Sequence, residues 1–414
     1  MRVALVVVLV AFAFGFGARG AEAAPSVRFG IQDDAWLEFG PGTLVQRVAE
    51  LDRLGLDIVR VTVYWNRTEQ APGRFDWRRS DRLLRALHAR GLAPLVTLWG
   101  TPGWASEGGP PNAVPLRGAD FSRFAQAAAT RYPYVRNWTM WNEPNKIAWL
   151  NPVSPRAYVT QILNPGYQGI KAANRAARVA GGVTGPRGGK GGIAPVDFIR
   201  AMDRAGARLD AYAHHPYPSY PGDTPYAAGG CGDCKTISMA TLERLLREVG
   251  RAFPRASIWL TEYAYQSDPD PFGVSRELQA RYVAEAARRV FAAPRVEMLI
   301  HYLYRDEPDL GRWQSGLETV NGDAKPALQA TMLPLAQVAR KGSSTSVWGQ
   351  VRPGDGPQGY VLQIWSNGKW TSIGGTRLTS GRGFLSRTVP AAKHSKLRLW
   401  YPARGLASPT LVVR

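Results

Sequence analysis

The sequence predicts an α/β protein, a (β/α)8 TIM barrel followed by a small C-terminal all-β sandwich domain. Two observations carry this prediction. Between residues 26 and 341, apolar β-type runs alternate with amphipathic segments, which is typical of parallel strands connected by helices. After residue 341 the chain changes to Gly- and Ser-containing linkers and short β-rich runs separated by turn signals. With 414 residues, 45% of them hydrophobic, the chain can bury a large core.

Eight strand and eight helix candidates can be placed in the first part of the chain. The strand candidates are residues 27–32, 58–64, 93–98, 135–141, 179–183, 209–215, 257–262 and 296–304. The helix candidates are residues 44–54, 80–90, 121–130, 155–177, 195–205, 239–252, 277–291 and 324–338. Their apolar positions recur at i, i+3 and i+4, as in Leu83, Leu84 and Leu87. An open doubly wound sheet is the alternative, but residues 30–34 do not form the Gly-rich phosphate turn that such a sheet often carries after its first strand.

The predicted C-terminal domain contains five short β-rich runs, at residues 346–351, 360–365, 384–389, 396–400 and 410–413. Its aromatic residues either form a carbohydrate-binding surface or, as we expect, belong to the core of a packing domain. We therefore place the domain boundaries at residues 1–23, 24–341 and 342–414. A chain that ends near Lys341 is expected to fold and to remain active on small substrates, because every candidate catalytic residue precedes that point.

The N-terminus has the order of a secretory signal peptide. A basic start, an apolar run from residue 3 to 16 and small residues ending in Ala21-Glu22-Ala23-Ala24 predict cleavage before Ala24 and a secreted, extracellular protein. The alternative is an uncleaved anchor, but the apolar run is shorter than the ~20 residues of a membrane span. No later segment is apolar enough to span a bilayer, so we expect no integral membrane association.

The chain contains two cysteines, Cys231 and Cys234, in a Gly- and Pro-rich loop. In an oxidising compartment a local disulfide is the simplest interpretation, with a free or redox-active pair as the alternative. A zinc site would need a second pair of ligands, and the sequence shows no obvious one. We therefore expect no metal.

The formal net charge is +20, from 52 Lys and Arg residues against 32 Asp and Glu residues. Such a charge fits nucleic acid, an anionic membrane or an acidic polysaccharide. Most of the excess is arginine scattered along helices, which indicates a compositional bias, so we expect no nucleic acid partner and leave an acidic glycan open. No P-loop, His-Glu-x-x-His motif or serine-hydrolase elbow occurs, and we expect no cofactor.

Two glutamates stand at the ends of predicted barrel strands. The fourth strand ends in Trp141-Asn142-Glu143-Pro144-Asn145 and the seventh in Thr261-Glu262. Catalytic groups of such barrels lie where strands end, so both carboxylates should face the mouth. Two carboxylates that flank a glycosidic bond are what acetal hydrolysis needs, because one protonates the leaving oxygen while the other attacks or stabilises the anomeric carbon.

These two motifs resemble the acid/base and nucleophile signatures of clan A glycoside hydrolases, with families 39 and 5 as the nearest matches, over roughly residues 27 to 340. The resemblance implies a retaining mechanism, with Glu143 as acid/base and Glu262 as nucleophile. It also implies that Arg60 and Tyr217 support Glu262 and that Asn142 binds the substrate 2-hydroxyl. His215 resembles the clan's strand-six histidine, although His214 is the alternative inward residue.

The sequence departs from family 5 at strand three, where residues 98–104 look more like family 39. Strand eight ends in residues 301–306 without the tryptophan common in the clan, and Tyr304 is the aromatic residue that we expect to bind substrate there. Flat aromatic faces fit pyranose rings, and about half of six tryptophans near strand ends are expected to be sugar platforms. These six are Trp36, Trp65, Trp99, Trp104, Trp149 and Trp313, of which Trp65, Trp99 and Trp104 are the predicted substrate-binding residues.

The predicted function is a secreted, monomeric glycosidase that acts on a polysaccharide or oligosaccharide, possibly an acidic one. A transglycosylase would use the same pair of glutamates, while a glycan-binding pseudoenzyme or a cationic adhesin on the same barrel would not turn over substrate. For the retaining mechanism we expect carboxyl groups ~5–5.5 Å apart. We also expect an ionised Glu262 and a Glu143 whose pKa is raised.

Overall fold

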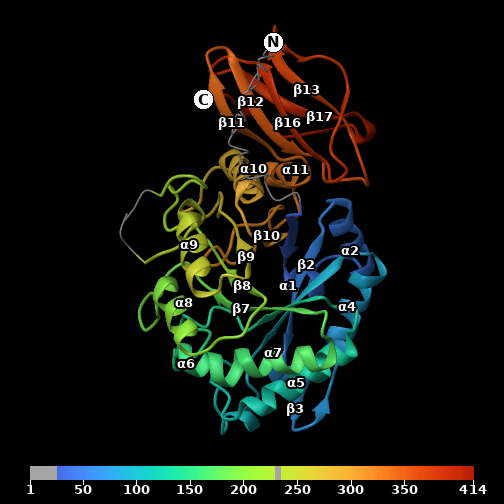
Figure 1. Ribbon diagram of the computed structural model, residues 1–414. Helices are drawn as coiled ribbons and strands as arrows, with labels where there is room; N and C mark the ends of the chain where they lie inside the picture. Colours follow the sequence, from blue (N-terminus) through green and yellow to red (C-terminus); the bar gives the residue numbers. More distant parts are fainter. Residues whose placement is uncertain (1–25, 229–234) are drawn as a thin grey trace, which may run out of the picture.

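The computed structural model describes residues 26–228 and 235–414, and a closed barrel of eight parallel strands forms its larger part (Figure 1). The predicted fold class is therefore confirmed. The barrel strands, in order around the barrel, are β1 (Arg28–Gln32), β2 (Ile58–Tyr64), β5 (Ala93–Trp99), β6 (Asn137–Met140), β7 (Arg178–Thr184), β8 (Ala211–His214), β9 (Ser257–Tyr263) and β10 (Val296–Tyr302). Strand β10 pairs with β1 and closes the barrel.

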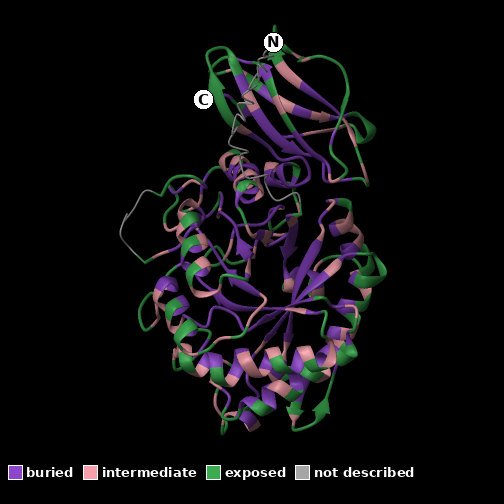
Figure 2. Cartoon of the chain, viewed as in Figure 1, coloured by how far each residue is buried: buried purple, intermediate pink, exposed green. Residues whose placement is uncertain are grey.

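Helices surround the barrel, with buried residues toward the strands and exposed residues toward solvent (Figure 2). The long helices are α2 (Leu44–Arg53), α4 (Arg78–Ala89), α5 (Gly118–Arg131), α7 (Asn164–Ala173), α8 (Pro195–Arg204), α9 (Leu242–Ala252) and α10 (Arg276–Ala292). The short elements include α1 (Asp34–Phe39), α3 (Trp65–Thr68) and the β3–β4 pair (Glu69–Ala71 and Arg74–Phe75). Among the helices in the described part of the chain, none is long and apolar enough to cross a membrane.

The helix predicted over residues 155–177 is divided into three parts. A short α6 (Pro155–Ala157) continues as a π-helical segment, η2 (Tyr158–Leu163), before α7 begins at Asn164. Pro165 accounts for the π-helical segment, because it has no N–H to donate and its ring would clash with the carbonyl four residues earlier in a regular α-helix. In η2 the N–H of Asn164 instead donates to the carbonyl of Val159, five residues before it.

Alternate residues of the strands fill the barrel interior. This inner cluster is apolar and is formed by Ile58, Leu95, Ala180, Val183, Ala211, Ala213, Trp259, Met298 and Ile300. Continuing the two-residue period toward the strand ends brings Arg60 of β2, His215 after β8 and Tyr302 of β10 to the barrel mouth. The alternation therefore decides which polar side chains face the site.

The C-terminal residues form the predicted all-β domain, which consists of two antiparallel sheets. The first sheet contains β11 (Leu335–Lys341), β12 (Ser344–Gln350) and β16 (Phe384–Pro390). The second contains β13 (Gly359–Ser366), β14 (Lys369–Ser372), β15 (Arg377–Leu378), β17 (Lys396–Tyr401), β18 (Leu406–Ala407) and β19 (Leu411–Val412).

Strand β11 shows that the boundary placed after residue 341 and the helix predicted over residues 324–338 are wrong. The last helix, α11 (Pro326–Met332), ends before Pro334, and residues 335–341 pair with β12 in the C-terminal domain. The reason is local, because a proline disfavours helical backbone in the residue that precedes it. The C-terminal domain therefore begins near residue 335.

The two domains share a buried contact. Phe291 of α10 packs against Trp348 of β12 and Phe384 of β16, with ring centroids 5.3 and 4.7 Å apart. A second contact involves Arg352, whose buried guanidinium lies 4.0 Å from the ring centroid of Phe29 in β1 and donates a hydrogen bond of 2.5 Å to the carbonyl of Thr331. Removing the C-terminal domain would expose apolar surface of the barrel.

We therefore expect a chain truncated after Lys341 to lose solubility or to melt at a much lower temperature than the full chain, contrary to the expectation from sequence. In the full chain, Trp348→Ala should cost about 3–5 kcal/mol of stability. Trp365→Ala is the matched control, because that side chain is 43% exposed. Thermal unfolding of the full chain and these three variants tests this, and a truncated chain as stable as the full protein would show that the contact is dispensable.

Candidate active site

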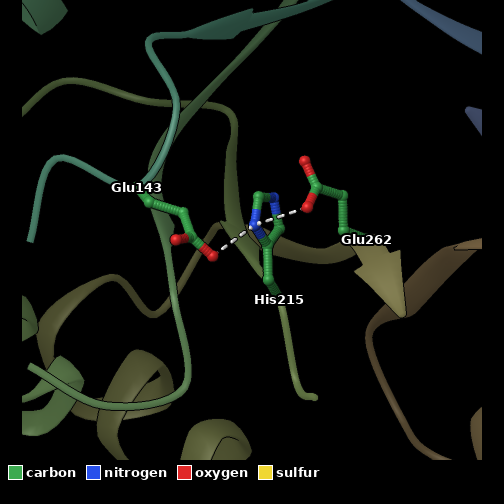
Figure 3. Close-up of side chains that lie close together, drawn as sticks. All are labelled: Glu143, His215 and Glu262. Atoms are coloured by element: carbon green, nitrogen blue, oxygen red, sulfur yellow. Dashed lines mark hydrogen bonds and ion pairs between the residues drawn. The ribbon is translucent and has the colours of Figure 1, made fainter. Parts of the chain in front are cut away.

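The carboxyl ends of the barrel strands open into a cleft with a volume of about 580 Å³. Residues at or just beyond the carboxyl ends of all eight barrel strands line it, and Glu143 and Glu262 both lie in its wall. Figure 3 shows the two glutamates on either side of His215, with their carboxylates directed toward the imidazole ring. All three residues are buried.

Glu143 follows β6 in a strained turn. The backbone is left-handed at Trp141 (φ 77°) and at Glu143 (φ 38°), a region that side-chain-bearing residues rarely adopt. The turn is held from two sides, because the Glu143 N–H donates to the carbonyl of Val183 at 2.9 Å and the Trp141 indole donates to the carbonyl of Trp149 at 2.7 Å. Such strain concentrates at functional sites, where surrounding contacts maintain it.

Glu262 reaches the cleft through an irregularity in β9. Leu260 pairs with Leu299 and Tyr263 with His301, so two residues of β9 lie opposite one residue of β10. This β-bulge lets Thr261 and Glu262 both face the barrel interior, where a regular strand would direct only one of them.

Arg60 is the polar centre of the site. It is fully buried, and its Nη1 lies 2.5 Å from Glu262 Oε1, while its Nη2 donates to Asn142 Oδ1 at 2.9 Å. Gln32 and Thr97 accept further hydrogen bonds from the same guanidinium, at 2.6 and 2.9 Å. A buried charge needs such partners, and these bonds hold Glu262 and Asn142 in place.

His215 connects the two glutamates. Its Nδ1 lies 3.1 Å from Glu143 Oε1 and 3.5 Å from Glu262 Oε2, and its Nε2 lies 3.1 Å from Thr261 Oγ1. His214 points away from the cleft, with its ring nitrogens near Thr184 Oγ1 and the carbonyl of Ile237, and burial lowers its pKa to about 3. The inward histidine is therefore His215.

Tyr217 completes the surroundings of Glu262. Its hydroxyl donates to Glu262 Oε2 at 3.1 Å, so this carboxylate receives hydrogen bonds on both oxygens. Burial raises the pKa of Tyr217, which therefore stays a hydrogen-bond donor across the physiological range.

The pKa of Glu143 differs from the expectation from sequence. Burial acts to raise it, but the hydrogen bond and charge of His215 and the charge of Lys146 outweigh burial and lower the pKa to about 2. Lys146 Nζ lies 2.7 Å from Glu143 Oε2. The prediction of a raised pKa is therefore wrong for the substrate-free site, because His215 and, to a smaller extent, Lys146 stabilise the charged form of this carboxylate.

The donor atoms of Glu143, His215 and Glu262 lie within 4.8 Å of one another, which is close enough for a metal ion. However, Arg60 and Lys146 already place positive charges beside the two carboxylates. A cation bound between them would be repelled by these charges, so the arrangement does not favour a metal.

Three of the six tryptophans near strand ends line the cleft, namely Trp99, Trp149 and Trp313. Trp65 does not, because it is buried against Phe124 and its indole donates to Glu69 Oε2. Trp104 packs edge-on against Trp65, and its indole donates to the carbonyl of Glu69. The predicted substrate contacts of Trp65 and Trp104 are therefore wrong, and Trp36 likewise lies outside the cleft, stacked on another aromatic ring.

The prediction that Tyr304 binds substrate in the cleft is also wrong. Strand β10 ends at Tyr302, and the left-handed backbone of Leu303 (φ 80°) turns Tyr304 onto Trp36, with ring centroids 4.0 Å apart. Its hydroxyl donates to Glu50 and Glu318, away from the cleft. Tyr302 occupies the cleft in its place, in edge contact with Tyr217 and Trp313.

Sequence reasoning missed several other residues of the cleft, among them Gln32, Asp34, Lys146 and Arg187. Gln32 and Asp34 could have been found by the rule that already selected the glutamates, because they lie at and just beyond the end of β1. The cysteine pair and the residues of the expected signal peptide lie outside the described residues.

The fold and the site together define a (β/α)8-barrel protein with two carboxylates at the barrel mouth, both in contact with His215. No protein-family model and no curated protein matches the chain. Among solved structures it is similar to a family 39 glycoside hydrolase from Bacteroides cellulosilyticus WH2, with 18% identity, a TM-score of 0.61, and 94% of this chain and 81% of that chain covered.

A glucosidase from Croceicoccus marinus is similar at 10% identity and a TM-score of 0.60, over 92% of this chain and 96% of that one. Xylanase 10B from Thermotoga petrophila RKU-1 is similar at 14% identity and a TM-score of 0.51, over 74% of this chain and 92% of that one. The chain therefore shares the barrel fold of glycoside hydrolases, as its motifs predict.

Proposed function

We propose that this protein is a retaining glycosidase that hydrolyses O-glycosidic bonds of a polysaccharide or oligosaccharide by double displacement. The observation that carries the proposal is the pair of buried glutamates at the barrel mouth, with carboxylate oxygens within 4.8 Å. With one oxygen of each carboxylate this close to the other, the arrangement favours the ~5–5.5 Å carboxyl separation of retaining enzymes over the ~6.5–9.5 Å of inverting ones.

In the proposed first step, a Glu262 oxygen bonds to the anomeric carbon as the glycosidic C–O bond breaks, and Glu143 gives its proton to the leaving oxygen. In the second step Glu143 takes a proton from a water molecule that attacks the same carbon and releases Glu262. Arg60 and Tyr217 orient the attacking carboxylate. Because Asn142 accepts from Arg60 through its carbonyl, its NH₂ group is left to donate to a substrate hydroxyl.

The solved structures to which the chain is similar support a glycosidase and differ in their named substrates. They include an exo-β-1,4-mannosidase and a β-glucuronidase, besides the glucosidase and the xylanase. The identity of the sugar is therefore not part of the proposal.

A transglycosylase would use the same two glutamates and would differ only in the acceptor of the second step. A binding protein without turnover is less favoured, because both carboxylates are in place together with Arg60 and Tyr217. We further propose that the enzyme acts outside the cytoplasm, since residues 1–23 have the order of a signal peptide.

The configuration of the product tests the proposal. Purified protein is screened on a panel of polysaccharides and aryl glycosides, and ¹H NMR follows the anomeric signal of the first product during cleavage. We expect the first-formed sugar to have the configuration of the substrate. A first product of inverted configuration, or no cleavage on any member of a broad panel, would overturn the mechanism.

A further inference from the structure

The wall of the cleft beside Glu143 carries unmatched positive charge. Of the cleft-lining side chains that follow β6 and β7, two are cationic, Lys146 and Arg187, and one is anionic, Glu143. The loop after β7 that carries Arg187 is pinned beside Glu143 by Asn145. Its Oδ1 accepts from the N–H of Gly185 at 2.8 Å, and its Nδ2 donates to the carbonyl of Ile193 at 3.0 Å.

Lys146 is built into this wall. Its ammonium reaches Glu143 Oε2, on the other oxygen from the one that His215 contacts. A Cβ at Gly185 would lie 2.5 Å from Lys146 Cε and 2.8 Å from Glu143 Oε1, so a larger residue there would displace the ends of both side chains. The side chain of Lys146 is still 30% exposed, which leaves it accessible from the cleft.

Arg187 has no carboxylate partner among the residues that the structure describes. Its guanidinium donates only weakly, to the carbonyls of Pro218 and Ser219 at 3.3 and 3.5 Å. The cations elsewhere in the cleft are balanced differently, since Arg79 pairs with Glu38 and Arg312 with Glu307, at 2.6 and 2.9 Å. Arg67 and Arg79 both lie over the ring of Tyr64.

The position of Lys146 relative to the reacting bond follows from the proposed function, on which this inference rests. Glu262 attacks the anomeric carbon and Glu143 protonates the oxygen that leaves. Side chains beside Glu143, on the side away from Glu262, therefore face the leaving sugar. An anionic group on that sugar would meet Lys146 and Arg187 together.

We propose that the leaving-group side of the cleft binds an anionic sugar residue, bearing a carboxylate or a sulfate, through Lys146 and Arg187. On binding, Lys146 moves from Glu143 to the substrate anion. Glu143 then takes a proton from solvent and passes it to the glycosidic oxygen as the bond breaks. The anion thus removes a charge that keeps Glu143 deprotonated in the free enzyme.

A pair of aryl glycosides with the sugar found by the screen tests this. One carries a 3-carboxyphenyl leaving group and the other the uncharged 3-carbamoylphenyl group, and both leave poorly enough to need the proton of Glu143. We expect the wild type to prefer the carboxylate substrate in kcat/KM by at least ~10-fold, the effect of one or two charged hydrogen bonds. Lys146→Met and Arg187→Met should each abolish most of this preference. Lys190→Met, an exposed lysine in the same loop outside the cleft lining, should retain it.

The pH profiles distinguish proton control from simple attraction. Because Glu143 must be protonated, activity falls as pH rises through its pKa. For the carboxylate substrate, the basic limb of kcat, which reports the complex, should lie at higher pH than that of kcat/KM, which reports the free enzyme. The two limbs should coincide for the carbamoyl substrate, and in Lys146→Met they should coincide for both substrates and shift to higher pH.

Equal kcat/KM values for the two substrates in the wild type, or an unchanged preference in Lys146→Met and Arg187→Met, would overturn this inference while leaving the glycosidase intact. Failure to cleave either substrate would instead count against the proposed function. Binding of uronate-containing and sulfated oligosaccharides to Glu262→Gln, measured by calorimetry, then shows which anion the subsite takes.

Discussion

Replacing Glu262 with alanine is expected to reduce activity by several orders of magnitude on every substrate, whatever its leaving group. The proposed covalent route starts at this carboxylate, so no other side chain can form the glycosyl-enzyme. The variant should remain folded, because Arg60 keeps its hydrogen bonds to Gln32, Thr97 and Asn142. Initial rates with good and poor leaving groups, together with thermal unfolding, check the expectation.

Azide adds a second measurement to the Glu262→Ala variant. A small anion in the space left by the carboxylate should attack the anomeric carbon directly and give a glycosyl azide of configuration opposite to the substrate. Glu307→Ala is the matched control, since that glutamate also lines the cleft but pairs with Arg312. A similar loss in both variants would mean that Glu262 has no special role.

Replacing Glu143 with alanine should have an effect that depends on the leaving group. General acid catalysis contributes about 10²- to 10⁴-fold, so we expect a loss of that size for natural glycosides and a much smaller one for activated aryl glycosides. Added azide should restore activity and give a glycosyl azide with the configuration of the substrate, because Glu262 still forms the intermediate. Equal losses for all leaving groups, without rescue, would contradict the assignment of acid and base.

The barrel was predictable because its strands and helices follow regular periods, and the two glutamates were predictable because they stand at strand ends. Apolar runs at even spacing define parallel strands, and the ends of parallel strands in a barrel meet at one mouth, so Glu143 and Glu262 had to converge. Ala211 and Ala213 face the barrel interior, and the same alternation places His215, two residues further along, on that side in preference to His214. The choice between the two histidines can therefore be made from the alternation once the register of the strand is known.

The misplaced residues lie where the regular period stops. Tyr304 comes two residues beyond the end of β10, after the left-handed turn at Leu303, and the alternation no longer holds there. Trp65 follows β2 in a short helix, and a tryptophan in such a position can equally be core or platform. Lys146 was missed because its approach to Glu143 depends on the strained turn and on the space above Gly185, neither of which follows from a periodic pattern.

The bulge in β9 also limits how the chain can vary in length. Between Leu260 and Tyr263 the strand holds one residue more than its partner needs, and that surplus is what presents Thr261 to His215 and Glu262 to Arg60 together. A deletion of a single residue here would remove this irregularity and let the end of β9 pair regularly with the end of β10. Only one of the two contacts could then survive. Across homologous chains, the spacing of this segment should therefore be more constant than its hydrophobicity.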